Sequence, residues 1–322
     1  MIYGAIQGLS RPLPRIVFGT LQLANADAAT FSLLDSITEM GCYAFDTAHA
    51  YGDGASELVI GNWIQTRNNR SEVIIIGKGA HPARGKNRVN PESIKHDFQE
   101  SLSRLKSDYI DLFLLHRDDP AVPVGPIIEV LNDLKNEGKI VLFGASNWNR
   151  KRLEEAREYA QKNGLATFSV ASNQHSLAIQ YDDPYPGTLS INSSSDNSEW
   201  QWYKETQYPL LAWSSLARGF FSGKFTRDNL SAFTDPQSLI SIRCYAREDN
   251  FIRLDRARQL AEKKGASVPQ IALAYIFQQP LNCFAITGAS NTSHLKENIE
   301  ALKIGLTKKE VSWLDLKSDS LD

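Results

Sequence analysis

Short runs of apolar and β-branched residues alternate along the chain with longer stretches in which apolar residues recur every three or four positions. That alternation is typical of a parallel sheet whose strands are joined by helices. The runs that predict strands are 15–19, 42–46, 72–77, 109–115, 140–145, 167–173, 209–213 and 283–287. The stretches that predict helices include 28–40, 91–105, 124–136, 149–163, 250–264 and 268–277. Eight strands in this alternation favour a closed (β/α)8 barrel, the TIM-barrel architecture, over an open sheet.

Two connections in this pattern are long. Residues 174–199 are rich in Ser, Asn, Asp and Pro, which favour turns over a helix. The second connection spans residues 214–247. Because they follow the sixth and seventh predicted strands, both should lie at the carboxyl-terminal face of the barrel, where barrel enzymes carry their active sites. The tail after Leu306 predicts one extra surface helix, and residues 1–322 are expected to form a single domain because no linker or repeat interrupts them.

The charges of the chain are nearly balanced, with 35 Lys and Arg against 37 Asp and Glu. This balance cannot build a broad basic face, which argues against nucleic acid and membrane surfaces as partners. No run of about eighteen apolar residues predicts a membrane-spanning helix, and the start lacks the pattern of a secretory signal. Cys42, Cys244 and Cys283 have no CxxC spacing, so we expect reduced thiols and a cytoplasmic location. The histidines show neither HxH nor HExxH spacing, so no metal site is expected.

Ionisable side chains stand at the ends of three consecutive predicted strands. Asp46 closes the second strand, Lys78 follows the third, His116 follows the fourth, and Tyr51 lies five residues beyond Asp46. The carboxyl ends of neighbouring barrel strands meet on one rim, so these four side chains should lie together. Each alone has a structural explanation, as a turn cap, a solvated strand end or a hydrogen-bonded histidine. Three such strand ends in succession exceed what a solvated rim requires, and the rim is therefore the predicted active site.

Reduction of a carbonyl group suits these four side chains. A hydride arriving at the carbonyl carbon builds negative charge on oxygen, which needs a hydrogen-bond donor and then a proton. Free tyrosine is a weak acid, with a pKa of about 10. We expect the Lys78 ammonium to lower the pKa of Tyr51, and Asp46 to hold that ammonium charged and oriented. His116 would orient the carbonyl or help to relay the proton, so Tyr51 is the predicted general acid.

Six motifs follow one another along the chain: FDTAHAYGDGASELVIG, IIGKGA, YIDLFLLHRDDP, GASNW, SNQHSL and LLAWSSLARGFFSGKF. In this order they resemble the motifs of the aldo-keto reductase superfamily, and the resemblance covers nearly the whole chain. The resemblance implies a TIM barrel that reduces small aldehydes or ketones by hydride transfer from NADPH. It also implies that Asp46, Tyr51, Lys78 and His116 form the catalytic tetrad. A monomer is the expected state.

The same resemblance implies contacts to the cofactor. Ser146, Asn147 and Gln174 stand where the family binds the nicotinamide carboxamide, and Trp213 stands where an aromatic ring stacks on the nicotinamide. Residues 214–224 stand where the family wraps the pyrophosphate, and Glu297 with Asn298 resembles the adenine-binding pair. The residues expected to contact the cofactor are Gly19, Thr20, Asp46, Ser146, Asn147, Gln174, Trp213, Ser214, Ser215, Leu216, Gly219, Lys224, Gly288, Ser290, His294, Glu297 and Asn298.

The chain departs from the family pattern where the 2′-phosphate of NADPH binds. Many members carry Lys at the position of Gly288 and Arg at the position of His294. NADPH is still the expected cofactor, with NAD as the other candidate. We expect the backbone amides at residues 290–292, where a helix begins, to bind the phosphate, helped by His294 when it is protonated. Arg243 or Arg247 could add a fixed charge.

Three other interpretations stay open on sequence alone. Lys78 could form a Schiff base in a barrel aldolase, although Asp46 would keep it protonated. A cofactor-sensing subunit without enzymatic activity, resembling the β subunits of potassium channels, is the main alternative, and a metal hydrolase is weaker. The expected pocket walls give an apolar, aromatic mouth with one nearby cation: Leu21, His81, Arg117, Trp148, Tyr181, Tyr185 and Phe220.

Overall fold

The computed structural model describes residues 1–192 and 198–321 and contains a closed barrel of parallel strands. Around the barrel the strands follow the order β10-β3-β4-β5-β6-β7-β8-β9, so neighbours in sequence are neighbours in space. The predicted (β/α)8 architecture is confirmed. The barrel strands are β3 (Ile16–Gly19), β4 (Ala44–Asp46), β5 (Ile74–Gly79), β6 (Ile110–Leu115), β7 (Ile140–Ser146), β8 (Ala171–Ser172), β9 (Leu210–Ala212) and β10 (Cys283–Thr287).

Alternation of side chains along each strand divides the core into two layers. Val17, Ile76 and Leu114 belong to an inner cluster that fills the barrel. Phe18, Ile75 and Phe113 point the other way and join the larger cluster between the barrel and its helices. A small hairpin of β1 (Tyr3–Gly4) and β2 (Leu13–Pro14) precedes β3 and adds apolar side chains to the inner cluster, so it covers the amino-terminal end of the barrel.

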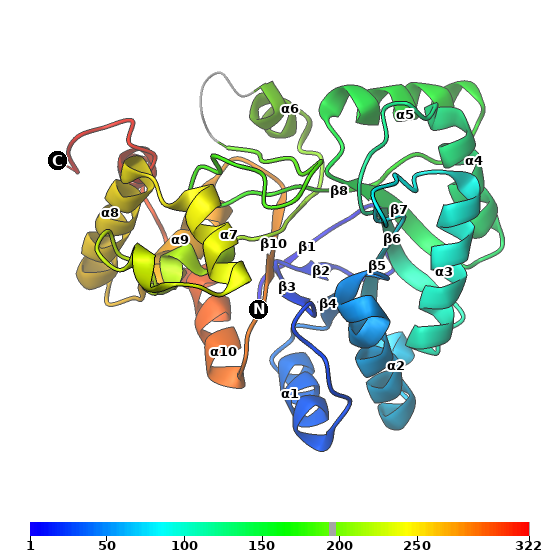
Figure 1. The fold of residues 1–322 in the computed structure, drawn as a ribbon, viewed down its shortest axis with the longest axis horizontal. Coiled ribbons are helices and arrows are strands. Elements are labelled where there is room, and N and C mark those ends of the chain that lie inside the picture. Colours follow the sequence, from blue (N-terminus) through cyan, green and yellow to red (C-terminus); the bar gives the residue numbers. More distant parts are fainter. Residues whose placement is uncertain (193–197, 322) are drawn as a thin grey trace.

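Helices surround the barrel, with α2 to α5 on one side and α7 to α10 on the other (Figure 1). Many of them begin at a capping side chain: Asn90, for example, accepts a hydrogen bond from the amide of Ser93. The helices are α1 (Ala28–Glu39), α2 (Ala55–Arg67), α3 (Pro91–Leu105), α4 (Val124–Asn136), α5 (Arg150–Lys162), α6 (Ser198–Thr206), α7 (Pro236–Tyr245), α8 (Glu248–Lys264), α9 (Val268–Gln278), α10 (Thr292–Glu300) and α11 (Lys308–Leu314). The helix expected after Leu306 is α11.

Some predicted boundaries are wrong. The third strand starts at Ile74 because residues 70–72 form a turn of 3-10 helix, and the predicted strand 167–173 pairs only over Ala171–Ser172. The connection 174–199 was expected to lack a helix, yet α6 begins at Ser198, while residues 193–197 lie outside the described residues. The connection 214–247 contains α7, whose start is capped by Asp235.

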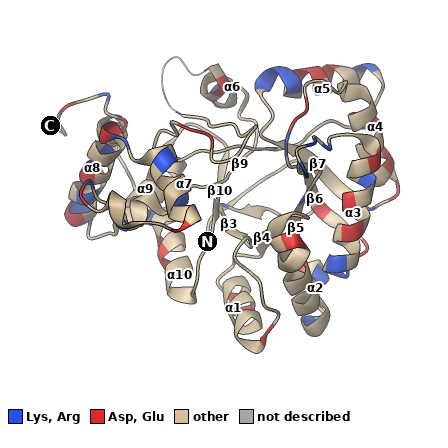
Figure 2. Cartoon of the chain, viewed as in Figure 1, with Lys and Arg blue, Asp and Glu red and all other residues tan. Residues whose placement is uncertain are grey.

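Lys and Arg residues alternate with Asp and Glu residues along α3, α5 and α8 (Figure 2). No helix in the described ranges is long and apolar enough to cross a membrane. In the same part of the chain, no group of three or more His, Cys, Asp or Glu side chains could hold a metal ion.

Candidate active site

The three strand ends meet as expected, and Lys78 lies at the centre of the group. Its Nζ atom is 2.6 Å from Oδ1 of Asp46, and both side chains are buried. The same nitrogen donates hydrogen bonds to the Tyr51 hydroxyl at 3.1 Å and to the backbone oxygen of Thr47 at 2.9 Å. An ammonium has three N–H bonds. Two of the three donate to these acceptors, and the ion pair with Asp46 adds a third contact that holds Lys78 in position.

Backbone hydrogen bonds carry the chain from the end of β4 to Tyr51. The amide of Thr47 donates to Ile76 at 2.8 Å, and the amide of His49 donates to Lys78 at 2.9 Å, so the segment continues along β5 after β4 has ended. Tyr51 then begins a short 3-10 turn, η1 (Tyr51–Gly54), and its amide donates to the backbone oxygen of Ala48 at 3.0 Å. This segment returns the Tyr51 side chain to Lys78, five residues after Asp46.

The electrostatics hold Lys78 charged. Burial by itself pulls the pKa of Lys78 down, but the carboxylate of Asp46 and then the hydroxyl of Tyr51 more than offset it, and the pKa of Lys78 lies above its ordinary value. Lys78 lowers the pKa of Tyr51, as expected, but burial raises it by more, so the pKa of Tyr51 lies above 10.0. At neutral pH the Tyr51 hydroxyl is therefore a proton donor and not a phenolate.

His116 stands beside Tyr51 and is neutral. Its ring packs edge-on against the ring of Tyr51, with 5.8 Å between centroids, and against His81, with 4.7 Å. Burial, followed by the charges of Lys78 and Arg117, holds the pKa of His116 well below its ordinary value. Its Nδ1 atom is buried and has no hydrogen-bond partner among the described residues. A neutral imidazole offers one N–H donor to a carbonyl oxygen.

The residues expected at the nicotinamide lie on adjoining strand ends. Ser146 Oγ donates to the backbone oxygen of Ser172 at 2.7 Å, and the side-chain amide of Asn147 donates to Ser146 Oγ at 3.0 Å. Gln174 pairs with Trp213 through a backbone bridge, but its side-chain amide is already bonded to Ser176 and Ser190. Trp213 is partly exposed, and its Nε1 atom lacks a partner within the described part of the chain.

The segment expected to wrap the pyrophosphate has an unusual backbone. Ser214, Ala217, Arg218 and Gly219 have φ values of 51°, 49°, 54° and 84°. Left-handed conformations at non-glycine residues cost free energy and tend to occur at functional sites, and turns that mix the two hands can gather N–H groups into an anion-binding concavity. The side chain of Ser215 donates to the oxygen of Ala212 at 2.8 Å, which ties the segment to β9. Other members of the expected set are partly or fully exposed here: Ser214, Leu216, Gly219 and Lys224.

The segment expected at the 2′-phosphate and adenine is the start of α10. Asn291 caps this helix by accepting a hydrogen bond from the amide of His294 at 2.9 Å, and the His294 ring lies 3.0 Å from the hydroxyl of Ser290. Gly288, Ser290 and His294 are exposed. Arg243, which was expected to add a charge here, forms an ion pair of 2.7 Å with Asp182.

The remaining expected contacts are more enclosed. Glu297 is partly buried, and Asn298 is 4% exposed. Thr20 donates two hydrogen bonds, from N and Oγ1, to the backbone oxygen of Asp46 at 2.9 and 3.0 Å, so Gly19 and Thr20 fix the rim between β3 and β4.

Two of the expected pocket walls are wrong. Trp148 and Phe220 are completely buried. Trp148 packs on Phe168, and its indole donates to the backbone oxygen of Arg117 at 3.0 Å. Trp148 and Phe220 therefore belong to the core. Leu21, Tyr181 and Tyr185 are exposed, while His81 and Arg117 lie close to the four central side chains.

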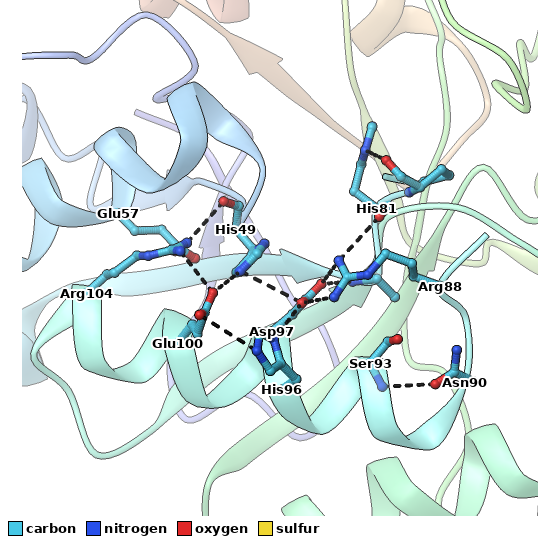
Figure 3. A network of polar contacts seen from close by, with 12 residues as sticks. His49, Glu57, His81, Arg88, Asn90, Ser93, His96, Asp97, Glu100 and Arg104 are labelled. Carbon is cyan, nitrogen blue, oxygen red and sulfur yellow. Dashed lines mark hydrogen bonds and ion pairs between the residues drawn. The ribbon is translucent and has the colours of Figure 1, made fainter. Parts of the chain in front are cut away.

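A polar network that was not predicted from the sequence includes His49, which lies two residues before Tyr51 (Figure 3). Arg104 of α3 donates to the backbone oxygen of His49 at 3.2 Å and pairs with Glu57 at 3.3 Å and Glu100 at 2.9 Å. The His49 ring lies 2.6 Å from Glu100. The network borders a cleft of about 380 Å³ lined by His49, Ala50, Asp53, His81, Pro82, Ala83, Arg88 and Arg104. The charged residues of α2 and α3 are evident in the sequence, but which of them pair with one another is not.

Comparison with known proteins agrees with this geometry. The model of the aldo/keto reductase family matches residues 15–319. Aryl-alcohol dehydrogenase GME11368 of Pestalotiopsis microspora is 29% identical over 88% of this chain and 71% of its own length. Norsolorinic acid reductase A of Aspergillus parasiticus is 29% identical over 93% of this chain and 76% of its own. The crystal structure of an aldo-keto reductase from Klebsiella pneumoniae in complex with NADPH has a TM-score of 0.71 and 24% identity, and the match covers 98% of this chain and 95% of that one. The chain therefore belongs to the aldo/keto reductase family and is an NAD(P)H-dependent oxidoreductase of that family.

Proposed function

We propose that the protein reduces aldehydes or ketones to alcohols with NADPH and that Tyr51 donates the proton. The observation that carries this proposal is the buried Asp46–Lys78 ion pair, 2.6 Å long, whose ammonium also donates to the Tyr51 hydroxyl at 3.1 Å. A structural role alone does not require a buried charge at a strand end, because burying ions costs several kcal/mol before their attraction is counted.

The proton route follows from these contacts. When bound, the cofactor would supply the hydride to the carbonyl carbon. The Tyr51 hydroxyl gives its proton to the carbonyl oxygen, and the resulting phenolate faces the Lys78 ammonium, which stabilises it. Asp46 keeps Lys78 charged, so the same pair eases the return of a proton to Tyr51 after the alcohol leaves. Neutral His116 donates a hydrogen bond that orients the carbonyl oxygen.

The cofactor residues support NADPH as the partner. Trp213 offers a partly exposed ring at the end of β9, and the left-handed residues Ser214, Ala217, Arg218 and Gly219 follow it. Ser146, Asn147 and Gln174 would face the carboxamide, and Ser290 with His294 would face the adenosine phosphate. The chain's relatives include an aryl-alcohol dehydrogenase and a norsolorinic acid reductase. Aromatic aldehydes and ketones are accordingly the first substrates to test.

The deciding experiment uses NADPH deuterated at the transferable position and a panel of aromatic aldehydes. We expect loss of NADPH absorbance to match the alcohol formed, with deuterium on the carbinol carbon. Tight NADPH binding without turnover of any aldehyde would contradict the proposal and favour a cofactor-sensing subunit.

A further inference from the structure

Arg117 is a buried cation without a carboxylate partner at the edge of the candidate active site. It follows His116 at the end of β6 and is 6% exposed. Among the described residues, its guanidinium donates only to two backbone oxygens, from Nη1 to His116 at 2.8 Å and from Nε to Pro186 at 3.3 Å. Within residues 1–192 and 198–321 no carboxylate lies within ion-pair distance of it. Since buried charges are normally paired, this arrangement calls for an anion from outside.

The other buried arginines make the contrast clear. Arg152 is 8% exposed and pairs with Asp118 at 3.1 Å and Glu155 at 2.8 Å. Arg253 is 6% exposed and pairs with Asp249 at 2.6 Å. The chain thus supplies carboxylates to the buried arginines that serve its packing. Among the described residues, Arg117 is the buried arginine that has no carboxylate partner.

The charge of Arg117 acts on the groups proposed to do the chemistry. It lowers the pKa of Tyr51 and adds to the lowering of the pKa of His116, so the guanidinium lies near both. On the other side it contacts the connection after β8 through the backbone oxygen of Pro186. Arg117 therefore stands between the site of proton donation and the loop that borders it.

We propose that Arg117 binds an anionic group of the substrate, and that the preferred substrates are carbonyl compounds that also carry a carboxylate. This inference rests on the proposed reductase function. A guanidinium has five N–H donors in a planar fork that fits a carboxylate in a bidentate manner. Two of the five have acceptors in the chain, which leaves three for a ligand. The phosphates of the cofactor are expected at residues 214–224 and 290–294, which other connections supply.

The test compares two aldehydes that differ in one charge, 4-carboxybenzaldehyde and methyl 4-formylbenzoate, with NADPH. The wild-type protein should prefer the carboxylate by about tenfold or more in kcat/KM, because a charge-assisted pair is gained only there. Arg117→Met should lower this ratio by about tenfold or more through a higher KM for the carboxylate, and Arg117→Lys should keep part of it. Arg243→Met is the matched control, since Arg243 borders the same loop but already has Asp182 as its partner, and it should keep the wild-type ratio.

The outcomes separate the two proposals. If the wild-type protein reduces both aldehydes but its kcat/KM for the carboxylate is no higher than for the methyl ester, the inference about Arg117 is wrong and the reductase function stands. A wild-type preference that Arg117→Met leaves unchanged also overturns it. If neither aldehyde nor any of the aldehyde panel is reduced, the proposed function fails and the inference fails with it. Should Arg117→Met not fold, the wild-type ratio and Arg117→Lys decide.

Discussion

The Nζ atom of Lys78 lies 2.6 Å from Oδ1 of Asp46, and each side chain is 3% exposed. A lysine this deeply buried would lose its proton more readily if it stood alone, but the pair and the Tyr51 hydroxyl raise its pKa instead. The ammonium at the centre of the site is therefore stabilised by its two partners. Its removal has consequences for both stability and chemistry.

Lys78→Met should abolish reduction and also destabilise the fold, because it leaves the Asp46 carboxylate buried without its cation. Breaking a buried pair in this way costs about 3 kcal/mol, which urea unfolding can measure. The double variant Asp46→Asn with Lys78→Met should recover part of this loss, since no unpaired charge remains. A Lys78→Met protein with wild-type stability, or one that keeps the wild-type rate, would show that Lys78 neither balances the Asp46 charge nor takes part in reduction.

The pH dependence of stability should report His116. Its pKa in the folded chain lies well below the ordinary value, so below about pH 6.5 the unfolded chain binds more protons than the folded one. The stability contributed by neutral His116 is complete above that pH and is lost as pH falls below it. His116→Asn should therefore show a shallower decline in unfolding free energy on the acidic side. His81 and His175, whose pKa values burial also lowers, are present in both proteins and contribute to the remaining slope. Identical slopes for the two proteins would contradict the burial of a neutral His116.

Gly54 should be needed both because its backbone is left-handed and because the Arg104 side chain occupies the space beside it. Its φ is 91°, and a Cβ there would lie 2.6 Å from Cζ of Arg104, whereas Gly138, with φ of 71°, has open space around it. Gly138→Ala should cost about 1 kcal/mol from the left-handed conformation alone. Gly54→Ala should cost more and should also slow reduction, because Arg104 has to leave the oxygen of His49 on the Tyr51 segment. Equal costs, with activity retained, would mean that Arg104 moves freely.

His294→Arg should increase the preference for NADPH over NADH. His294 is exposed at the start of α10 and lies 3.0 Å from the hydroxyl of Ser290. An arginine there adds a permanent planar donor for a phosphate, and the ratio of dissociation constants should rise by about tenfold. Glu300→Arg, at the other end of the same helix, is the control and should leave the ratio unchanged. Fluorescence quenching by each cofactor measures it, and equal effects of the two variants would remove His294 from the phosphate site.

The strand ends of the site were predictable because they rest on short-range rules. Asp46 and Lys78 each end an apolar run, and parallel strands bring such ends together, so their meeting follows from the alternation of runs and helices. The two long connections were predicted less well. The dipeptide Asp235–Pro236 is a helix-start signal, but the weak amphipathic pattern of the following residues concealed α7.

The electrostatics and the pocket walls were beyond reach of the sequence. Whether Lys78 or burial dominates the pKa of Tyr51 depends on how much water is excluded, and that is set by packing from several connections. Trp148 was expected at the mouth, yet its indole donates to the backbone oxygen of Arg117 and its ring packs on Phe168. The partners of Arg104 come from two helices and a loop, a pairing that no local pattern encodes.

The most direct test of this account is the turnover of Tyr51→Phe on a good aldehyde substrate, measured together with its affinity for NADPH. The variant lacks only the hydroxyl that accepts a hydrogen bond from Lys78. Because general acid catalysis typically contributes 10²–10⁴-fold, kcat should fall by about a thousandfold while the dissociation constant of NADPH changes by less than about threefold. A Tyr51→Phe protein that binds NADPH and reduces the aldehyde at close to the wild-type rate would contradict the assignment of Tyr51 as the proton donor.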